Sequence, residues 1–414
     1  MSTRVDLSLA DQGMKKILWA YDHMGVLKLL EDRFGFGTTP LSGKSVGMSI
    51  HMEAKTARLA LLLNKMGARV YATGCNPLST QDDVAAGLQS MGVDVFAKHG
   101  ASPEEYKENL LDVLDREPDF IIDDGGDLFE AYYNLPDHHK WPVIGGCEET
   151  TTGITRLKAY EILGELPFPM VNVNDAKCKH LYDNVYGTGQ STINAIMSVT
   201  NSVIASKTVV VAGYGFCGRG IAKRMRGMGA QVIVTEVDPV KAIEAKLEGF
   251  EVMPMLDAAQ IGDIFVTATG CRDVITRKHF PLMKHNAILC NSGHFDVEIN
   301  LNDLAEMATD IRERRNNIVG YRLTSEKVLN VLAEGRLVNL AAGDGHPAEI
   351  MDTSFALQTL SLCWLADNRG KLKNKLYDVP NAIDQKVARL KLQTMDVDID
   401  QLTKSQRKYL GLNG

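Results

Sequence analysis

Hydrophobic and polar positions follow two alternating periods along the chain. From residue 11 to residue 34, apolar residues recur at helical spacing, which predicts an amphipathic helix with a break near Gly25. Short apolar runs then alternate with helical stretches: SVGMSI precedes a helix over 52–66, RVYATG one over 81–91 and DVFAKHG one over 103–114, and DFIIDDGGD and FPMVNVND follow. Strands that alternate with helices indicate right-handed βαβ crossovers, so we expect a parallel sheet in this first part of the chain.

The stretch 207–238 reads as strand, glycine turn, helix and strand. Its first strand, VVV at 209–211, is apolar on both faces, as a parallel strand covered by helices requires. In the G-x-G-x-x-G that follows, Gly213 allows the tight turn, Gly215 lets the backbone approach a pyrophosphate, and Gly218 lets the helix pack closely on the strand. Glu236 ends the second strand, where a carboxylate accepts both ribose hydroxyls and repels a 2′-phosphate. The stretch therefore predicts a Rossmann site for NAD rather than NADP.

The later segments extend this organisation. A helix over 191–206 leads into the stretch, and EVMPM, DIFVTATG and AILCNSGHF predict further strands. After His346 come a long apolar helix, a second helix over 383–392 and a short charged tail. We therefore expect an α/β protein of two doubly wound parallel-sheet domains with a helical C-terminal segment. The expected boundaries are 1–188 with 346–395 for a substrate domain, 189–345 for the Rossmann NAD domain and 396–414 for the tail.

Composition narrows the class of protein. A hydrophobic content of 45% with 23% charged residues is typical of a globular protein, and a net charge of -7 gives no reason to expect nucleic acid as a partner. We find no apolar window long enough for a membrane span and no secretory signal. The seven cysteines are scattered without a C-x-x-C pair, which predicts a reduced, cytoplasmic protein. The neighbouring His138 and His139 read as a solvated loop, and we expect no metal site.

Polar clusters stand at predicted strand ends or turns, where open α/β sheets bind their ligands. They comprise His51; Asp123, Asp124 and Asp127; Glu148 and Glu149; Lys179, Asp183 and Asn184; His294; and His346. Each has an ordinary structural interpretation, such as a turn former, a helix-start carboxylate, a solvated lysine or a core histidine. Together they suit hydride transfer, since a lysine beside its own aspartate can be tuned as a base, and Asp124 or a histidine could move a carbon-bound proton. From the residues alone, we predict an NAD enzyme acting on a polyhydroxy substrate.

A family resemblance sharpens this prediction. The segments GMSIHMEAKTA, CNPLSTQDD, IIDDGGD, CEETTTG, NDAKCKHLYDNVYG, VVVAGYGFCGRG, NSGHFDVEI and VLAEGRLVNLAAGDGHP resemble the S-adenosylhomocysteine hydrolase family in order and over nearly the whole chain. The resemblance implies reversible cleavage of S-adenosylhomocysteine to adenosine and homocysteine. A tightly held NAD oxidises the ribose 3′-hydroxyl, homocysteine is eliminated, water adds and the ketone is reduced again. It also implies a homotetramer.

The resemblance assigns roles to matching positions. Lys179 would be the base at the 3′-hydroxyl, oriented by Asp183 and Asn184. Glu149 would bind the ribose hydroxyls, Asp124 and His51 would transfer protons at the 4′ and 5′ carbons, and His294 would lie near the 3′-hydroxyl. The NAD site would add Thr150, Thr151, Thr152, Thr269 and Asn339 to the glycine turn. The substrate site would add Gln81, Glu53, Lys55 and His346, with His346 closing over the purine at a hinge.

Three departures from the family pattern keep alternatives open. Glu53 and Lys55 stand where common members have a threonine and a glutamate, and an ammonium meets a 6-carbonyl better than a 6-amino group. Some members of a second lineage with this HMEAKTA pattern prefer the inosyl substrate; alternatively, Lys55 simply pairs with Glu53 or another acid. The family's lysine- and tyrosine-bearing tail is shortened to QRKYLGLNG, and Thr188 and Gly25 replace a common cysteine and proline.

Two alternatives to a hydrolase are a non-catalytic protein and an ordinary dehydrogenase. A non-catalytic NAD-binding regulator would retain the fold without turnover, although the proposed catalytic set is complete. An ordinary dehydrogenase would release NADH, on the order of one per substrate turned over.

Overall fold

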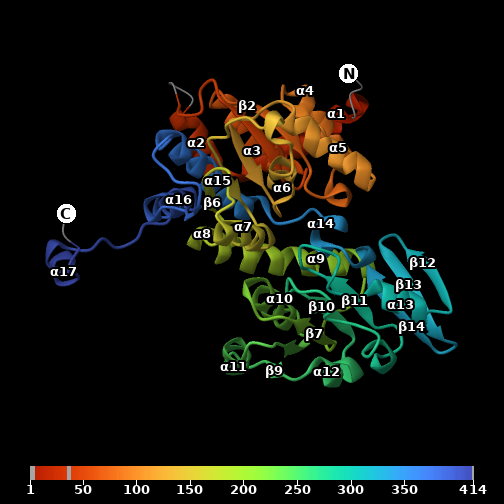
Figure 1. Cartoon of the computed structure of the whole chain (residues 1–414). Helices are drawn as coiled ribbons and strands as arrows, with labels where there is room; N and C mark the ends of the chain where they lie inside the picture. Colours follow the sequence, from red (N-terminus) through yellow and green to blue (C-terminus); the bar gives the residue numbers. More distant parts are fainter. Residues whose placement is uncertain (1–4, 35–38, 413–414) are drawn as a thin grey trace.

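The computed structural model describes residues 5–34 and 39–412, which form two lobes joined by the long helix α9 and by a return crossing near residue 345. One lobe holds the N-terminal half and the C-terminal helices, and the other holds the middle of the chain (Figure 1). Within the described residues, no helix is long and apolar enough to cross a membrane. The first four residues and the last two of the predicted domains lie outside the described part.

The first lobe contains a seven-stranded parallel sheet in the order β15-β6-β5-β4-β1-β2-β3. The strands are β1 (Ser45–Ser49), β2 (Arg69–Thr73), β3 (Asp94–Val95), β4 (Phe120–Asp123), β5 (Gly145–Glu148), β6 (Met170–Asn172) and β15 (Leu376–Asp378). Their register aligns Ser49 with Asp123, Asp123 with Glu148 and Glu148 with Asn172. The polar strand ends predicted from the sequence therefore meet along one edge of the sheet.

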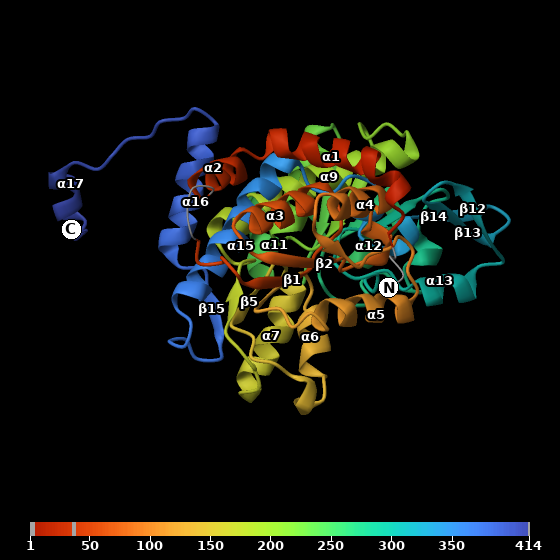
Figure 2. The same ribbon diagram turned by 90° about the horizontal axis from the view of Figure 1, so that it is seen from above.

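Helices cover both faces of this sheet (Figure 2). They are η1 (Leu7–Leu9), α1 (Ala10–His23), α2 (Gly25–Phe34), α3 (Ala54–Lys65), η2 (Pro77–Ser79), α4 (Asp82–Ser90), α5 (Pro103–Leu114), α6 (Asp127–Tyr133), η3 (Asp137–His139), α7 (Thr151–Leu163), α8 (Lys177–His180), η4 (Asp183–Gly187), α15 (Ala348–Asp367) and α16 (Asn381–Thr394). The predicted break near Gly25 is confirmed. The carboxylate of Asp352 on α15 accepts hydrogen bonds from the N–H groups of Val26 and Leu27, both at 2.9 Å, and so begins α2 as a new helix.

The second lobe contains an eight-stranded sheet in the order β12-β13-β14-β11-β10-β7-β8-β9. The strands are β7 (Thr208–Ala212), β8 (Gln231–Thr235), β9 (Glu251–Val252), β10 (Ile264–Thr267), β11 (Ile288–Asn291), β12 (Asp310–Arg315), β13 (Ile318–Thr324) and β14 (Lys327–Leu332). The α/β fold class is confirmed, but this sheet is mixed. Strands β12, β13 and β14 pair antiparallel because loops of two residues join them, and such loops cannot make a parallel crossover.

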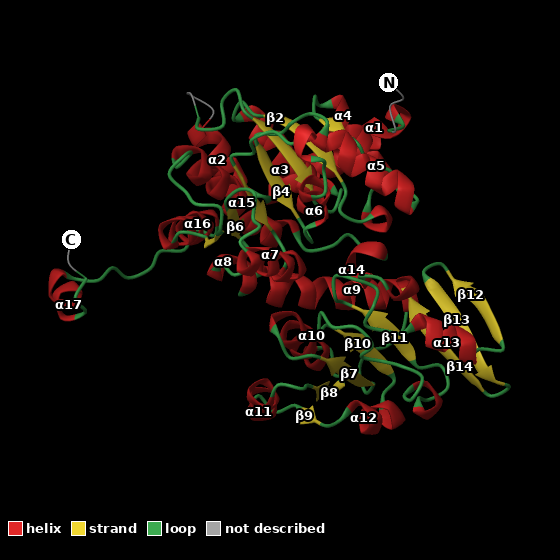
Figure 3. Cartoon of the chain, viewed as in Figure 1, coloured by secondary structure: helices red, strands yellow, loops and turns green. Residues whose placement is uncertain are grey.

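The second lobe has its own helices and its own core. The helices are α9 (Thr188–Thr200), α10 (Phe216–Gly227), α11 (Pro239–Leu247), α12 (Met255–Ile261), η5 (Phe280–Leu282), α13 (Leu301–Met307), η6 (Ala333–Gly335) and α14 (Val338–Ala341). Buried apolar residues of 193–338 cluster here, apart from those of the first lobe. Figure 3 shows helices on the two sides of this sheet as well. Residues 393–412 are exposed, and the segment after α16, including α17 (Lys404–Tyr409), extends away from both lobes (Figures 1 and 2).

Candidate active site

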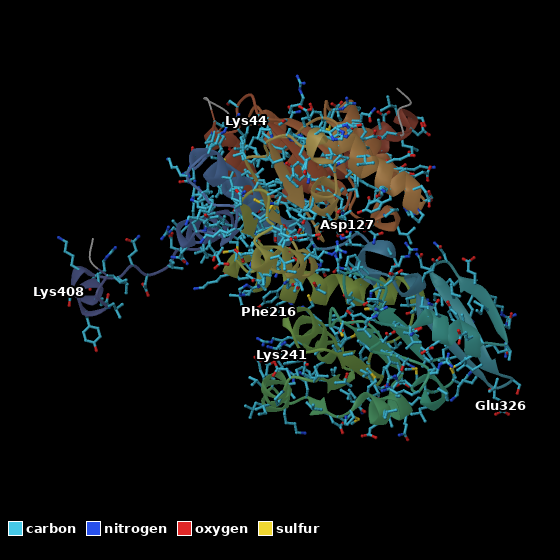
Figure 4. All side chains as sticks on the ribbon, viewed as in Figure 1. Lys44, Asp127, Phe216, Lys241, Glu326 and Lys408 are labelled. Atoms are coloured by element: carbon cyan, nitrogen blue, oxygen red, sulfur yellow. The ribbon has the colours of Figure 1, made fainter. Side chains whose placement is uncertain are left out.

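A cavity of about 560 Å³ lies between the two lobes, at the carboxyl ends of both sheets. Many of the predicted site residues line it: His51, Glu53, Asp124, Glu149, Thr150, Thr151, Thr152, Lys179, Asp183, Asn184, Gly215, Thr269, His294, Asn339 and His346. Each of His51, Asp124 and Glu149 follows its strand end by one or two residues, since β1, β4 and β5 end at Ser49, Asp123 and Glu148. Figure 4 shows Asp127 in the upper lobe, with Phe216 and Lys241 in the lower lobe.

Lys179 is the centre of a buried charged cluster. Its ammonium donates to Asn184 Oδ1 at 2.9 Å and lies 3.3 Å from Asp183 Oδ2 and 3.5 Å from Glu149 Oε1. Lys179 and Asp183 are four residues apart, and the π-helical turn η4 carries Asp183 and Asn184. Behind Lys179, the Asp384 carboxylate accepts the N–H groups of Lys177 and Cys178 at 3.1 and 2.9 Å, which caps α8.

The charged groups of this cluster determine one another's pKa values. Burial opposes the charge on Lys179, but the carboxylates of Asp183 and Glu149 outweigh it and raise the pKa of the lysine. Burial raises the pKa of Glu149 to about 7, against the attraction of the Lys179 ammonium. Lys179 is therefore an ammonium in this cleft, and Glu149 is the member that titrates near neutral pH. The expected role of Lys179 as the base at the 3′-hydroxyl stays a prediction.

Asp183 joins the cluster to the return crossing of the chain. Its Oδ1 lies 2.7 Å from His346 Nδ1, and its Oδ2 accepts the Ser354 hydroxyl at 2.7 Å. Burial favours the protonated acid, but Lys179, His346 and Ser354 together lower the pKa of Asp183. Asp183 is therefore an ionised carboxylate that contacts His346 through Oδ1 and accepts the Ser354 hydroxyl through Oδ2.

A second cluster surrounds Asp124. His51 Nε2 lies 3.6 Å from Asp124 Oδ2, His294 Nδ1 lies 4.0 Å from Asp124 Oδ1, and the Cys75 thiol donates to Oδ2 at 3.7 Å. His51 Nδ1 is 2.6 Å from Ser79 Oγ, which fixes the ring. Burial lowers the pKa of His51 to about 4 despite the nearby Asp124 carboxylate, so this imidazole is neutral.

The Asp124 cluster also bears on the expectation that no metal is bound. Ligand atoms of His51, Asp124 and His294 lie within 4.8 Å of one another, a set that could hold a metal ion. Sequence patterns missed this grouping because the three residues come from distant segments. The expected absence of a metal remains a prediction. The other histidine pair, His138 and His139, lies in the exposed turn η3.

Three of the sequence-predicted acids support the site from beneath or beside it. Asp123 accepts the N–H groups of Asp124 and Phe129, at 3.0 and 2.7 Å, and Glu148 accepts those of Gly125 and Thr150, both at 2.9 Å. Burial raises the pKa of Asp123 to about 8 and that of Glu148 as well. Asp127 pairs with the Arg156 guanidinium at 2.6 Å. These carboxyls shape the loops that carry Asp124 and Glu149.

The glycine turn suits a dinucleotide. Gly213 has φ +94°, and a Cβ on Gly218 would lie 1.9 Å from the Gly213 carbonyl oxygen, so both positions require glycine. A Cβ on Gly215 would meet none of the described atoms within 4 Å, which leaves space above the α10 N-terminus for a phosphate. Glu236 braces the turn by accepting the Tyr214 N–H at 2.7 Å.

Asn339 borders the same cavity, and Glu298 supports a loop that borders it. Asn339 Oδ1 is buried and has no hydrogen-bond partner among the described residues, so it can accept from a ligand. Glu298 holds the loop of Thr269 and Gly270, whose N–H groups it accepts at 3.0 and 2.8 Å. No sequence pattern points to Glu298, because its role depends on a loop 28 residues away. These residues fit NAD, and the fit rests on this open turn and the unpaired amide oxygen.

Glu53, which lines the cavity, pairs with Lys55, which does not line it. Lys55 Nζ lies 2.6 Å from Glu53 Oε2 and donates to the Asp344 carbonyl oxygen at 2.5 Å. The pairing considered as an alternative in the sequence analysis is therefore present. Gln81, expected at the substrate, instead turns away from the cavity lining: its Oε1 accepts the Lys16 ammonium at 3.0 Å. The physical reason is that Gln81 begins α4, which packs on α1 where Lys16 lies.

Comparisons with known proteins agree with this organisation. Residues 3–137 match the family described as S-adenosyl-L-homocysteine hydrolase, and residues 184–345 match its NAD binding domain. An S-inosyl-L-homocysteine hydrolase of Methanococcus maripaludis is 53% identical over 410 residues, which cover 99% of this chain and 98% of that protein. An adenosylhomocysteinase of Thermotoga maritima is 53% identical over 398 residues, covering 96% and 98%.

The solved structure of a dipicolinate synthase chain from Bacillus halodurans is 15% identical, with a TM-score of 0.50 over 79% of this chain and 99% of that one, a likeness of fold alone. The family resemblance of the motifs is confirmed by the sequence matches, which extend over nearly the whole chain. The chain belongs to the S-adenosyl-L-homocysteine hydrolase family and carries that family's NAD-binding domain.

Proposed function

We propose that this enzyme reversibly hydrolyses S-adenosyl-L-homocysteine to adenosine and L-homocysteine. The observation that carries the proposal is the buried Lys179 cluster, which faces the open glycine turn across one cavity. Bound NAD supplies a reversible hydride acceptor for the 3′ carbon of the ribose. Thr150, Thr151, Thr152, Thr269, Asn339, Glu236 and the glycine turn are the residues proposed to hold it.

The Lys179 cluster is proposed to handle the 3′-hydroxyl proton. The Lys179 ammonium can hydrogen-bond the ribose oxygen and stabilise negative charge on it. Glu149 Oε1 is buried, without a hydrogen-bond partner in the described chain, and close to Lys179, so it can receive the proton. Asp183 and Asn184 keep the ammonium in position. The raised pKa of Glu149, about 7, suits a group that gains and loses a proton near neutral pH.

The Asp124 cluster is proposed to handle the elimination. Asp124 takes the proton from the 4′ carbon, the bond from the 5′ carbon to sulfur breaks, and the proton held by Asp124 passes to the thiolate, directly or through His51 or His294. Water then adds at the 5′ carbon with the proton transfers reversed. His51 and His294 flank Asp124 at 3.6 and 4.0 Å, which supports this assignment.

The test is release of homocysteine from S-adenosylhomocysteine by the purified, NAD-loaded protein. Catalytic release of homocysteine without net NADH supports the proposal. Tight NAD binding without homocysteine from either nucleoside substrate would revive the non-catalytic regulator. Accumulation of about one NADH per substrate would indicate an ordinary dehydrogenase.

A second candidate substrate is S-inosyl-L-homocysteine, supported by the 53% identical S-inosyl-L-homocysteine hydrolase of Methanococcus maripaludis. With its carboxylate engaged by Lys55, Glu53 is less available to accept from a 6-amino group. The Lys55 ammonium has three N–H donors, of which Glu53 and the Asp344 carbonyl occupy two, so one remains for a 6-carbonyl. Steady-state kcat/KM for both substrates decides the question: a clear adenosyl preference eliminates the inosyl candidate.

We further propose the domain boundaries and the assembly expected from the sequence. Strand β15 joins the first sheet and the strands of 208–332 form the second, which supports 1–188 with 346–395 as substrate domain and 189–345 as NAD domain. The exposed apolar side chains of the extended tail, such as Ile399 and Leu402, support its burial in a homotetramer. Light scattering of the full chain tests the tetramer.

A cytoplasmic location is also proposed. All seven cysteines are free, in keeping with that location.

A further inference from the structure

Helix α15 places two buried polar side chains against the carboxylates that flank Lys179. The Ser354 hydroxyl donates to Asp183 Oδ2 at 2.7 Å, and the Gln358 amide donates to Glu149 Oε2 at 2.5 Å. Both side chains have an exposed fraction of 0%. Residues four apart share one face of a helix, so a single rigid surface of α15 holds both acids.

These two bonds decide which carboxylate oxygens remain for the reaction. With Oε2 bound to Gln358, Glu149 turns Oε1 toward Lys179 at 3.5 Å. With Ser354 and His346 on its two oxygens, Asp183 keeps Oδ2 at 3.3 Å from the ammonium. The position of the proton-handling group therefore depends on Ser354 and Gln358, which do not line the cavity themselves.

The rest of α15 shows that its core packing does not require these groups. Most of the helix is buried, and Phe355, Leu357 and Leu362 belong to the apolar core of the first lobe. A buried hydroxyl or amide costs free energy unless it is hydrogen-bonded. Among the described residues, the Ser354 hydroxyl and the Gln358 amide nitrogen offset that cost through the two acids of the site, whereas Gln358 Oε1 has no hydrogen-bond partner.

We propose that Ser354 and Gln358 are positioning residues of the reaction, which hold Asp183 and Glu149 in the geometry that Lys179 requires. This inference rests on the proposed function of the Lys179 cluster. It adds the C-terminal helix α15 to the parts of the chain that determine proton transfer at the ribose.

The two residues have separable effects on pH dependence. The charged groups that act on Glu149 are Lys179, Asp183 and Asp124, and Gln358 adds a neutral donor. Loss of that donor removes a bond to the ionised carboxylate and raises the pKa of Glu149. Asp183 keeps Lys179 and His346, so the loss of the Ser354 hydroxyl leaves it ionised but less well oriented.

The experiment follows bound NADH in single turnovers of the NAD-loaded full chain, mixed with S-adenosylhomocysteine or S-inosylhomocysteine across a pH series. The variants are Gln358→Met, which keeps size and removes the donor, and Ser354→Ala. The matched control is Ser361→Ala, because Ser361 is buried on the same helix and its hydroxyl has no partner among the described residues.

We expect Gln358→Met to slow NADH formation roughly tenfold or more near neutral pH, because the variant loses a hydrogen bond to a charged group. The rate of NADH formation should recover at higher pH, where Glu149 is ionised again. Ser354→Ala should slow NADH formation at every pH without shifting the pH dependence of the rate. Ser361→Ala should match the wild type. Profiles of Gln358→Met that coincide with Ser361→Ala overturn the inference, whereas a wild type that forms neither NADH nor homocysteine overturns the proposed function instead.

Circular dichroism and retained NAD show whether Gln358→Met folds. If it does not, a second variant tests the inference. Gln358→Glu is nearly isosteric and places a second carboxyl beside Glu149. Because the two carboxyls repel, the pH dependence of NADH formation should shift further to high pH than in Gln358→Met. An unmoved profile in that variant also overturns the inference.

Discussion

The imidazole of His346 bridges the two crossings between the lobes: its Nδ1 lies 2.7 Å from Asp183 Oδ1 and its Nε2 lies 3.2 Å from Thr188 Oγ1. Thr188 begins α9, where the chain enters the second lobe, and His346 stands where it returns. Asp183 in turn contacts Lys179. One ring therefore connects the relative placement of the lobes with the ammonium of the site.

Gly187→Ala should displace this ring. A Cβ on Gly187 would lie 2.8 Å from His346 Nδ1, so the ring must shift, and its contact with Asp183 Oδ1 should be disturbed. We expect kcat to fall roughly tenfold or more, as for the loss of a charge-assisted hydrogen bond. Gly227→Ala is the control, because its Cβ would meet none of the described atoms within 4 Å. Equal kcat for the two variants would contradict the coupling.

Lys179→Ala and Asp124→Asn should abolish turnover while the protein stays folded. Each change removes the central group of one cluster, and we expect a loss of about a hundredfold or more in kcat. Homocysteine release measures turnover, and circular dichroism with NAD content measures folding. Full activity of either variant would eliminate the role proposed for that residue.

Asp183 should make stability depend on pH at the acid side. The folded-state pKa of Asp183 is lowered, since Lys179, His346 and Ser354 outweigh burial. The ionised acid therefore stabilises the fold above its unfolded pKa of about 4, and this contribution is lost as pH falls below that value. The free energy of unfolding of the wild type should exceed that of Asp183→Asn near neutral pH, and urea titrations should show the difference shrinking toward about pH 3. A difference independent of pH would refute the assignment.

Asp384→Ala should weaken both the fold and catalysis. The Asp384 carboxylate caps α8, which carries Lys179, and loss of such a cap costs about 1 kcal/mol of unfolding free energy. Because Lys179 loses its support, kcat should fall more than this small destabilisation alone implies. Gln385→Ala, an exposed neighbour on the same helix, is the control. Unchanged kcat in a destabilised Asp384→Ala would show that the cap is only structural.

Two glycine variants separate cofactor binding from folding. Gly215→Ala has room for its Cβ, so the protein without NAD should unfold at the wild-type temperature, but the stabilisation that added NAD supplies should shrink. In Gly218→Ala the Cβ would lie 1.9 Å from a backbone oxygen, so the unfolding temperature should fall with or without NAD. Thermal unfolding with and without NAD measures both effects. A full NAD response in Gly215→Ala would remove this turn from the cofactor site.

The helices and turns that are best predicted from sequence are those whose ends are determined by residues close together in the chain. The helix predicted over 103–114 is α5 at Pro103–Leu114, because Ser102 and Glu105 form a capping box and Pro103 occupies the first turn. The glycine turn is similarly local. The meander β12–β14 was not predicted, although its two-residue loops, with Asn317 at φ +63°, leave a hairpin signal in the sequence.

The sequence by itself determined the α/β class, the dinucleotide turn and the residue types at the strand ends, since these depend on short-range periodicity and on backbone conformations that only glycine adopts readily. Tertiary structure decided how those residues act. Lys179 is held as an ammonium because carboxylates from separate segments surround it. Asp183 is oriented by a serine 171 residues away along the chain, and Glu149 by a glutamine 209 residues away, both on one buried helix. Burial and charge–charge distance determine a group's protonation, and both arise only when distant segments pack together.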